Sequence, residues 1–270
     1  MEVSEEIKNQ IAADYNNNVS LRKLAVQYGI SGKAYREILR EKKVVILPSP
    51  SNGKGSRKYT SNGAFFDVIQ REEQAYWLGF LSADGNIQGN PIRFELSSQD
   101  VKHLHKFVTA LKADYPVHYC WHKSQGKYFK DAWVEINPEQ LVYGLEALGV
   151  TPRKTKYIKP WVSRVGRIEQ ELKITYWRGW VDGDSCISFY TSKGAYKGTC
   201  TIGLVGNKAV MAGFRDFLTQ SLGPRNSILF NPNNSRYVVS YSGIAAKKVA
   251  RLLYENATVY LDRKMEKAQK

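Results

Sequence analysis

A repeated segment constrains the fold of this chain more than any other feature of its sequence. The first copy, residues 76–87, reads YWLGFLSADGNI, and the second, residues 176–187, reads YWRGWVDGDSCI. Tyr, Trp, Gly, Asp and Ile recur at matching places, and the position after the first glycine is aromatic in both copies. Internal self-similarity of this kind indicates two structurally equivalent halves.

Each copy reads as a helix that runs directly into a strand. Gly79 and Ala83 in the first copy, and Gly179 and Gly183 in the second, lie four residues apart and so share one helical face. Glycine inside a helix costs about 1 kcal/mol relative to alanine, so its presence needs a packing reason. Close approach of two backbones supplies that reason, and we expect the two helices to pack together with Gly79 and Gly179 at their interface.

A carboxylate ends each of these helices. Asp84 and Asp184 lie where the helix dipole is negative, which disfavours a carboxylate by roughly 0.3–1 kcal/mol, and pairing the helices adds repulsion between the two charges. A divalent cation would offset both effects, because carboxylates and backbone carbonyls are the hard oxygen ligands that suit Mg²⁺. The sequence predicts a metal site formed by these two aspartates, with the nearby backbone carbonyls as further oxygen ligands.

The two segments resemble the LAGLIDADG motif of homing endonucleases, which occurs twice in the single-chain members of that family. Residues 77–85 and 177–185 align with the nine motif positions. The family's metal-binding aspartate, at the eighth position, falls on Asp84 and Asp184, and the carbonyls of the residues before them, Ala83 and Gly183, complete the predicted ligand set.

Two motif positions differ between the copies. The sixth is Ser82 in the first copy and Asp182 in the second, so Asp182 is not expected to be a metal ligand. The ninth departs from the motif in the second copy, as Ser185. The resemblance covers residues 57–270, and two copies at this spacing make it specific.

The resemblance implies an α+β fold: a pseudo-two-fold pair of αββαββα halves with saddle-shaped antiparallel sheets, residues 71–160 and 161–270. Alternating apolar positions agree with it. They predict strands at residues 92–96, 117–121, 187–189, 198–204 and 237–241, and helices at residues 102–111 and 209–218.

The resemblance also implies a function, site-specific cleavage of both strands of a long, asymmetric double-stranded DNA target by a monomer. The expected cofactor is Mg²⁺ or Mn²⁺, with Ca²⁺ as a non-productive substitute. Similar enzymes place a lysine near each active site, and Lys154 and Lys264 occupy matching places after the two halves. We expect them to stabilise charge in the transition state or to handle protons, beside the catalytic aspartates Asp84 and Asp184; a role in positioning phosphates is the alternative.

Polar side chains that alternate with the apolar positions of the strands are expected to face the DNA. Such strands can read base edges in the major groove, while Lys and Arg also hold phosphates. In the first half these are Asn86, Gln88, Arg93, Glu95, His118 and His122, and in the second half Ser188, Tyr190, Lys197, Thr199, Thr201, Arg236 and Ser240.

The N-terminal residues 1–45 predict a small all-α domain that resembles a helix-turn-helix. Small Ala25 would let two helices approach, and Gly29, four residues later, would allow the tight turn. The second helix would then offer Lys33, Arg36 and Arg40 to a DNA groove or its phosphates; the alternative is a packing module with a charged face. A stretch rich in Pro, Ser and Gly predicts a linker over residues 46–70.

The charge of the chain agrees with a polyanionic partner. Its 270 residues carry a net charge of +15, and residues 161–270, with 17 Lys and Arg against 8 Asp and Glu, hold +9 of it. No run of 18 apolar residues exists, so no membrane span is expected. An acidic N-terminus without an apolar segment and only three cysteines, without a CxxC pair, predict an intracellular protein, cytoplasmic or nucleoid-associated.

Two other functions stay open at this point. One is a DNA-binding regulator without enzymatic activity, although both eighth-position aspartates are retained. The other is a maturase that uses the same fold to bind intron RNA, which the basic second half would suit. A zinc site at His118, Cys120 and His122 is not expected, because no fourth ligand is evident.

Overall fold

The computed structural model describes residues 3–16, 24, 27–29, 32–42, 44, 59–87, 91–152, 154–164, 168–189, 199–223, 229–231 and 236–269. The chain divides into two compact units, residues 1–56 and residues 57–270. Each unit is considered by itself.

The first unit contains the helices α1 (Glu5–Asn16) and α3 (Gly32–Glu41). Their apolar faces meet in a small core formed by Ile11, Ala12, Ile38 and Leu39. Two ion pairs close the rim of this core, Lys8 with Glu41 at 3.0 Å and Lys42 with Glu5 at 2.7 Å.

Gly29, to which the sequence assigns a tight turn, is among the described residues before α3. Gly29 has φ +62°, in the left-handed region that favours glycine. Ala25 lies outside the described residues. Lys33, Arg36 and Arg40 lie on α3 as predicted, and the Arg40 side chain is exposed; the side chains of the other two are not described. The role of this unit in DNA binding stays a prediction.

The second unit has α+β architecture with two four-stranded antiparallel sheets of the same topology, β1-β2-β4-β3 and β5-β6-β8-β7. The first is formed by β1 (Asn86–Ile87), β2 (Ile92–Ser97), β3 (His118–Ser124) and β4 (Lys127–Ile136), and the second by β5 (Ser185–Phe189), β6 (Cys200–Gly206), β7 (Leu229–Asn231) and β8 (Arg236–Ser242). The helices are α4 (Glu72–Asp84), α5 (Val101–Ala110), α6 (Glu139–Ala147), α7 (Gln170–Asp184), α8 (Lys208–Leu222), α9 (Gly243–Tyr254) and α10 (Asp262–Ala268). Each half thus follows the predicted order of helices and strands.

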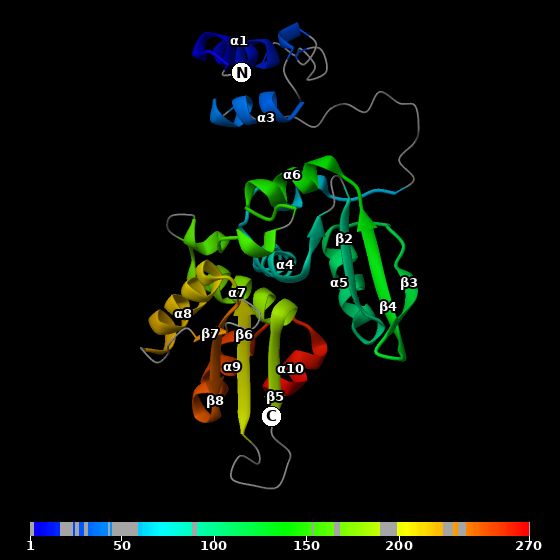
Figure 1. Ribbon diagram of the computed structural model, residues 1–270, viewed down its shortest axis with the longest axis vertical. Coiled ribbons are helices and arrows are strands. Elements are labelled where there is room, and N and C mark those ends of the chain that lie inside the picture. The colour runs from blue at the N-terminus through cyan, green and yellow to red at the C-terminus, as the bar shows by residue number, and fades with distance from the viewer. Residues whose placement is uncertain are drawn as a thin grey trace. The chain divides into compact units, whose positions relative to one another are not determined.

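The two motif helices, α4 and α7, form the centre of this unit and lie between the two sheets (Figure 1). Their contact is reciprocal. A Cβ on Gly79 would lie 2.0 Å from the carbonyl oxygen of Tyr176, and a Cβ on Gly179 would lie 2.1 Å from that of Tyr76. At these two glycines the backbones of the two helices meet, and any side chain there would keep them apart.

Residues at the start of the second unit pack into its core rather than forming a linker. Phe65 and Phe66, on the short helical turn Gly63–Phe66, are fully buried in the same cluster as the motif helices. Gln74 on α4 donates a hydrogen bond to the carbonyl of Phe65 at 2.7 Å. The linker predicted for residues 46–70 therefore extends too far: residues 59–70 belong to the second unit, and residues 46–58 lie outside the described part.

A buried polar cluster ties α7 to its neighbours. The Asp182 carboxylate accepts hydrogen bonds from the Tyr76 hydroxyl (2.7 Å), the Tyr254 hydroxyl (2.6 Å) and the Leu261 backbone N–H (2.7 Å). Burial nevertheless raises the pKa of Asp182, because a charged carboxylate is poorly solvated there. Through these three hydrogen bonds, the one carboxylate on α7 links α4, α9 and the segment before α10.

Within this cluster, a neutral histidine contacts Tyr76. The Tyr76 hydroxyl gives its one proton to Asp182, so it accepts from Nε2–H of His103 at 3.0 Å. Nδ1 of His103 is buried and has no hydrogen-bond partner among the described residues. Burial and the charges of nearby basic groups lower the pKa of His103 to about 3.

The part of the chain that the structure describes contains no helix long and apolar enough to cross a membrane.

A substitution of Gly179 by alanine tests the helix contact. The added methyl group would clash with the Tyr76 carbonyl, so Gly179→Ala should lower the free energy of unfolding by about 3 kcal/mol, measured by urea denaturation. Gly203→Ala is the matched control: its Cβ would meet only Ser240, with Oγ at 3.7 Å, an ordinary contact, and should cost less than about 1 kcal/mol. Equal losses in the two variants would contradict the backbone contact.

Replacement of His103 tests the neutral histidine. Its pKa is about 3 in the folded chain, against an ordinary value of 6.5 for an unfolded chain, so the unfolded state binds the proton first as pH falls. The wild type should therefore lose stability as pH falls below 6.5, by about 3 kcal/mol at pH 4 from this group alone. His103→Phe keeps the aromatic packing but has no group to titrate, so its free energy of unfolding should fall by about that much less over the same pH range. Identical dependence of stability on pH in the wild type and the variant would show that His103 is protonated in the folded chain.

Candidate active site

The motif helices bring the two predicted catalytic aspartates together. Asp84 and Asp184 are the last residues of α4 and α7. Both side chains reach solvent, yet protein atoms crowd them, and this desolvation raises the pKa of each carboxyl. The charge of Asp184 raises the pKa of Asp84 further, while Lys154 and Lys264 oppose the shift. The site thus concentrates negative charge that the protein neutralises in part.

Ala83 and Gly183 also meet across the interface. A Cβ on Gly183 would lie 2.6 Å from the Ala83 Cβ, so the two helices stay in contact up to the residues before the aspartates. This explains why the second copy has glycine where the first has alanine: one methyl group fits in this space and two do not.

Each predicted catalytic lysine lies at the end of one motif helix. Lys154, on the helical turn Lys154–Lys156, donates a hydrogen bond to the carbonyl of Gly85. Lys264, on α10, donates to the equivalent carbonyl of Ser185 at 2.9 Å. The two lysines therefore make the same contact with the residue that follows each aspartate, and a cation there is favoured by the helix dipole.

The two lysines differ in their remaining contacts. Lys264 is 2% exposed and also donates to the carbonyls of Val181 at 2.6 Å and Asp182 at 2.8 Å, so three carbonyls occupy its three N–H groups. Burial lowers the pKa of Lys264 to about 8. Lys154 is half-buried, and burial also lowers its pKa, against the pull of Asp84.

The donor set fits a hard divalent cation. Asp84 and Asp184 offer carboxylate oxygens, and their raised pKa values show that a positive charge between them would be favoured. Among the described residues, no group of three or more His, Cys, Asp and Glu could hold a metal. An ion at this place would take its other ligands from backbone carbonyls, water or a bound phosphate. Asp182 is committed to the buried cluster by its three hydrogen bonds.

The outward face of the first sheet carries the predicted DNA contacts. Arg93 and Glu95 alternate with buried residues on β2, and His118 and His122 share their face on β3 through the register with β4. Asn86, on β1, is exposed, and Gln88 lies outside the described residues.

Most of these side chains already have a partner on the same face of the sheet. Arg93 Nε lies 3.0 Å from Glu95 Oε2, and its guanidinium lies 4.3 Å from the centre of the Trp133 ring. The Trp133 ring stacks on His118 with centroids 4.5 Å apart, and His122 Nδ1 lies 2.8 Å from Asp131.

Asp131 and Trp133 were not predicted from the sequence. Their signal is the alternation of Ala132, Val134 and Ile136, whose buried side chains place Asp131 and Trp133 on the opposite face of β4. The exposed first half of the same strand, Lys127–Lys130, hides that alternation.

The second sheet has a matching outward face. Ser188 pairs with Thr201, and Thr201 with Ser242, so these residues share the face that Ser240 and Arg236 also occupy on β8. Arg236 lowers the pKa of Asp184, which places its charge near the candidate site. Thr199 precedes β6 and is half-buried; Tyr190 and Lys197 lie outside the described residues.

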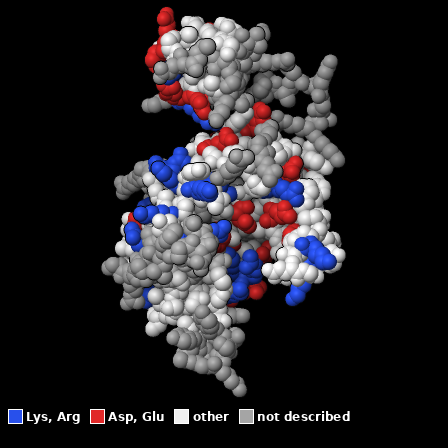
Figure 2. All heavy atoms as spheres, in the orientation of Figure 1, with Lys and Arg blue, Asp and Glu red and all other residues white. Residues whose placement is uncertain are grey.

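The surface charge is mixed rather than uniformly basic. Figure 2 shows acidic as well as basic side chains on the visible face of the second unit.

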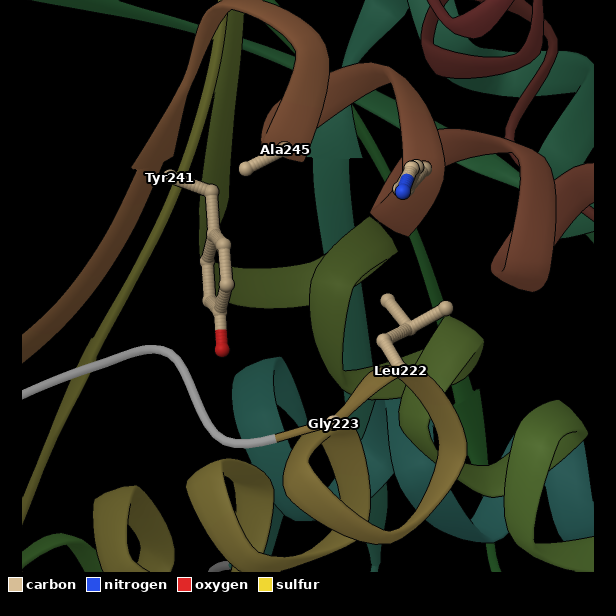
Figure 3. A pocket seen from close by; sticks show the side chains of 5 residues that line it. Leu222, Gly223, Tyr241 and Ala245 are labelled. Atoms are coloured by element: carbon tan, nitrogen blue, oxygen red, sulfur yellow. The ribbon is translucent and has the colours of Figure 1, made fainter.

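A small pocket lies apart from the motif helix ends, between α8, β8 and α9; Figure 3 shows Leu222, Tyr241 and Ala245 around it. Lys248 is its one charged lining residue among those described, so this pocket offers no acid–base pair there.

Comparison with known proteins identifies similar folds. No protein-family model matches the chain, and no curated protein matches its sequence. The solved structure of the homing endonuclease I-WcaI bound to its DNA recognition sequence matches with a TM-score of 0.51 and 14% identity, over 82% of this chain and 98% of that chain.

Two further structures are more distant. The LAGLIDADG homing endonuclease I-LtrWI bound to target DNA gives a TM-score of 0.46 at 11% identity, over 77% of this chain and 88% of that one. I-SmaMI bound to uncleaved DNA in the presence of calcium ions gives 0.45 at 12% identity, over 74% and 90%. The likeness to I-WcaI shows that this chain has the fold of that homing endonuclease.

Proposed function

We propose that this protein is a LAGLIDADG-type homing endonuclease, which cuts both strands of a long, asymmetric duplex DNA site. The observation that carries the proposal is the pair of carboxylates, Asp84 and Asp184, at adjoining ends of two helices in backbone contact. Each has a lysine on the carbonyl of the next residue. The fold shared with I-WcaI, a homing endonuclease solved with its DNA recognition sequence, supports the proposal.

In this proposal the two halves, residues 71–160 and 161–270, are related by a pseudo-two-fold axis along α4 and α7. Their outward sheet faces form a saddle over the DNA, and one chain suffices for both strands. The outward-facing side chains of the two sheets would read the bases. Arg93 would give up its contact with Glu95, and His122 its contact with Asp131, so that these four side chains could contact bases instead. Lys33, Arg36 and Arg40 of the first unit would add contacts outside the central site.

Each part of the candidate site has a defined task. The aspartates would hold Mg²⁺ or Mn²⁺, which would supply an activated water and stabilise negative charge on the phosphate. Lys154 and Lys264 offset the negative helix ends and add positive charge beside the scissile phosphates. Tyr76, Tyr254 and Asp182 keep the second motif helix in place. A DNA substrate fits the expected intracellular location, cytoplasmic or nucleoid-associated.

Cleavage of DNA in vitro tests the function. With Mg²⁺, the purified protein should cut a small set of related sequences within a randomised duplex library. It should also cut the uninterrupted form of its own insertion site, made by joining the two DNA sequences that flank its gene. Asp84→Asn should abolish cleavage, because it removes a metal ligand, yet bind the selected duplex within about threefold of the wild type when Ca²⁺ replaces Mg²⁺.

Asp216→Asn is the matched control for that variant. It removes an exposed carboxylate on α8 that pairs with its neighbour Arg215, and it should cut normally. Binding without cleavage by the wild type would favour the regulator instead. Cleavage by Asp84→Asn would show that the carboxylate assignment is wrong.

Cleavage of each strand, followed with different labels, tests the lysines. Lys154→Met should slow one strand about a hundredfold and Lys264→Met the other, because each removes the positive charge at one site. Lys264→Met also leaves three carbonyls without their donor and should lower the melting temperature. The ratio of the two strand rates does not depend on the folded fraction. A ratio equal to that of the wild type in both variants would refute separate roles.

A further inference from the structure

The hairpin of β3 and β4 carries a surface that the proposed function does not use. The register pairs Tyr119 with Ala132, Trp121 with Lys130 and Lys123 with Tyr128. Ala132 is buried on the core side of the sheet, so the other five residues lie on that same side. They are on the face opposite to Arg93, His118 and the other predicted DNA contacts.

This part of the hairpin extends beyond the hydrophobic core. The helix α5 lies against β2 and β4, yet Tyr119 is 51% exposed, Trp121 66% and Tyr128 69%. Single exposed apolar side chains are common, but three large aromatic rings on adjoining strands are not explained by packing. We call Tyr119, Trp121, Lys123, Tyr128 and Lys130 the hairpin surface.

Each ring of the hairpin surface has a lysine against it. Lys130 Nζ lies 4.5 Å from the ring centre of Tyr119 and 5.8 Å from that of Trp121, and Lys123 Nζ lies 5.6 Å from that of Tyr128. These cation–π contacts hold the ammonium groups beside the rings. Residues 118–130 contain three lysines and no Asp or Glu, and Figure 2 shows basic side chains at the tip of this hairpin.

We propose that the hairpin surface binds single-stranded RNA, with bases stacked on Tyr119, Trp121 and Tyr128 and phosphates held by Lys123 and Lys130. Exposed rings bind unstacked bases of any sequence, and neighbouring cations bind the backbone that joins them. Duplex DNA presents no unstacked bases, so it does not fit this surface. RNA loops and ends present them in the cell, and for this reason RNA is the assigned ligand.

Fluorescence anisotropy of a labelled, unstructured RNA of about 15 nucleotides tests the site in the full-length protein. The double variant Trp121→Ala/Tyr128→Ala should raise the Kd at least about tenfold, since loss of one stacked base costs about that much. Lys130→Gln should weaken binding and reduce its dependence on salt. Both changes lie on exposed side chains, so the melting temperature should be unchanged.

The matched control is Phe129→Ala. Phe129 lies on the same strand between Tyr128 and Lys130, but on the outward face, where it stacks on His122 with centroids 5.6 Å apart. Its loss should leave RNA binding unchanged. Equal weakening by Phe129→Ala, or unchanged binding by the double variant, would overturn the assignment to this face.

A spectroscopic measurement locates the bound bases. Trp121 is exposed, Trp133 is half-buried on the opposite face of the sheet, and Trp77, Trp161, Trp177 and Trp180 are buried, so stacking on Trp121 should quench tryptophan fluorescence. Trp121→Phe should keep the RNA affinity within about threefold and lose most of the quenching. Retained quenching in this variant would place the RNA elsewhere.

Two comparisons separate this proposal from the endonuclease. The same sequence as single-stranded DNA is compared in the same assay: stacking and phosphate contacts accept both, so RNA should bind at least as tightly as the DNA, and tighter binding of the DNA would overturn the choice of RNA. The double variant should cut duplex DNA at the wild-type rate, because the hairpin surface faces away from the proposed duplex site. Failure of the endonuclease assay would leave the RNA measurement intact.

Discussion

The contact between the backbones of α4 and α7 is the constraint on which the second unit depends. Gly79 and Gly179 each place their Cα against a carbonyl oxygen of the other helix, at a separation that excludes even a methyl group. Glycine weakens each helix by about 1 kcal/mol, so the burial of the flanking aromatic side chains must offset that cost. Trp77 and Trp177 do so, because both are fully buried against aromatic neighbours in their own halves.

The same contact creates the electrostatic problem that the candidate site solves. Helices that touch along their whole final turns must end side by side, so the carbonyls and carboxylates at both ends concentrate negative charge. Lys154 and Lys264 offset part of this negative charge, because their ammonium groups donate hydrogen bonds to the carbonyls of Gly85 and Ser185. A bound cation would neutralise more of the negative charge. Structure and proposed chemistry therefore share one origin, the absence of a side chain at two positions.

Much of the fold could be predicted from the sequence where the pattern is local. The helix-to-strand segments, the glycine contact and the alternation of Arg93 and Glu95 with buried residues all follow from spacing within a few residues. The strand β4 was missed because its first four residues are exposed on both faces and show no alternation. Short elements such as α10 and β7 carry too few residues for a period to appear.

The partners of Asp182 could not be predicted for a different reason. Its sixth position in the motif made it the less likely ligand, but nothing in the sequence pointed to its partners. Tyr76, Tyr254 and Leu261 are distant from it in sequence and meet it only in the folded core. The sequence around Asp182 did not indicate that its carboxylate would accept buried hydrogen bonds from three distant residues. The core position, rather than the residue type, decides between the two roles.

The two halves share a topology but not the environment of their lysines. Lys264 lies on a helix, α10, which places it in the core, where three carbonyls fix it and its pKa falls to about 8. Lys154 lies on a short helical turn, is half-buried and has one such bond among the described contacts. In a symmetric dimer both sites would have to be identical, because each would be built from the same residues. The two sites here belong to one chain and are built from different residues, so they need not be identical; under the proposed function, each would serve its own strand of the asymmetric duplex.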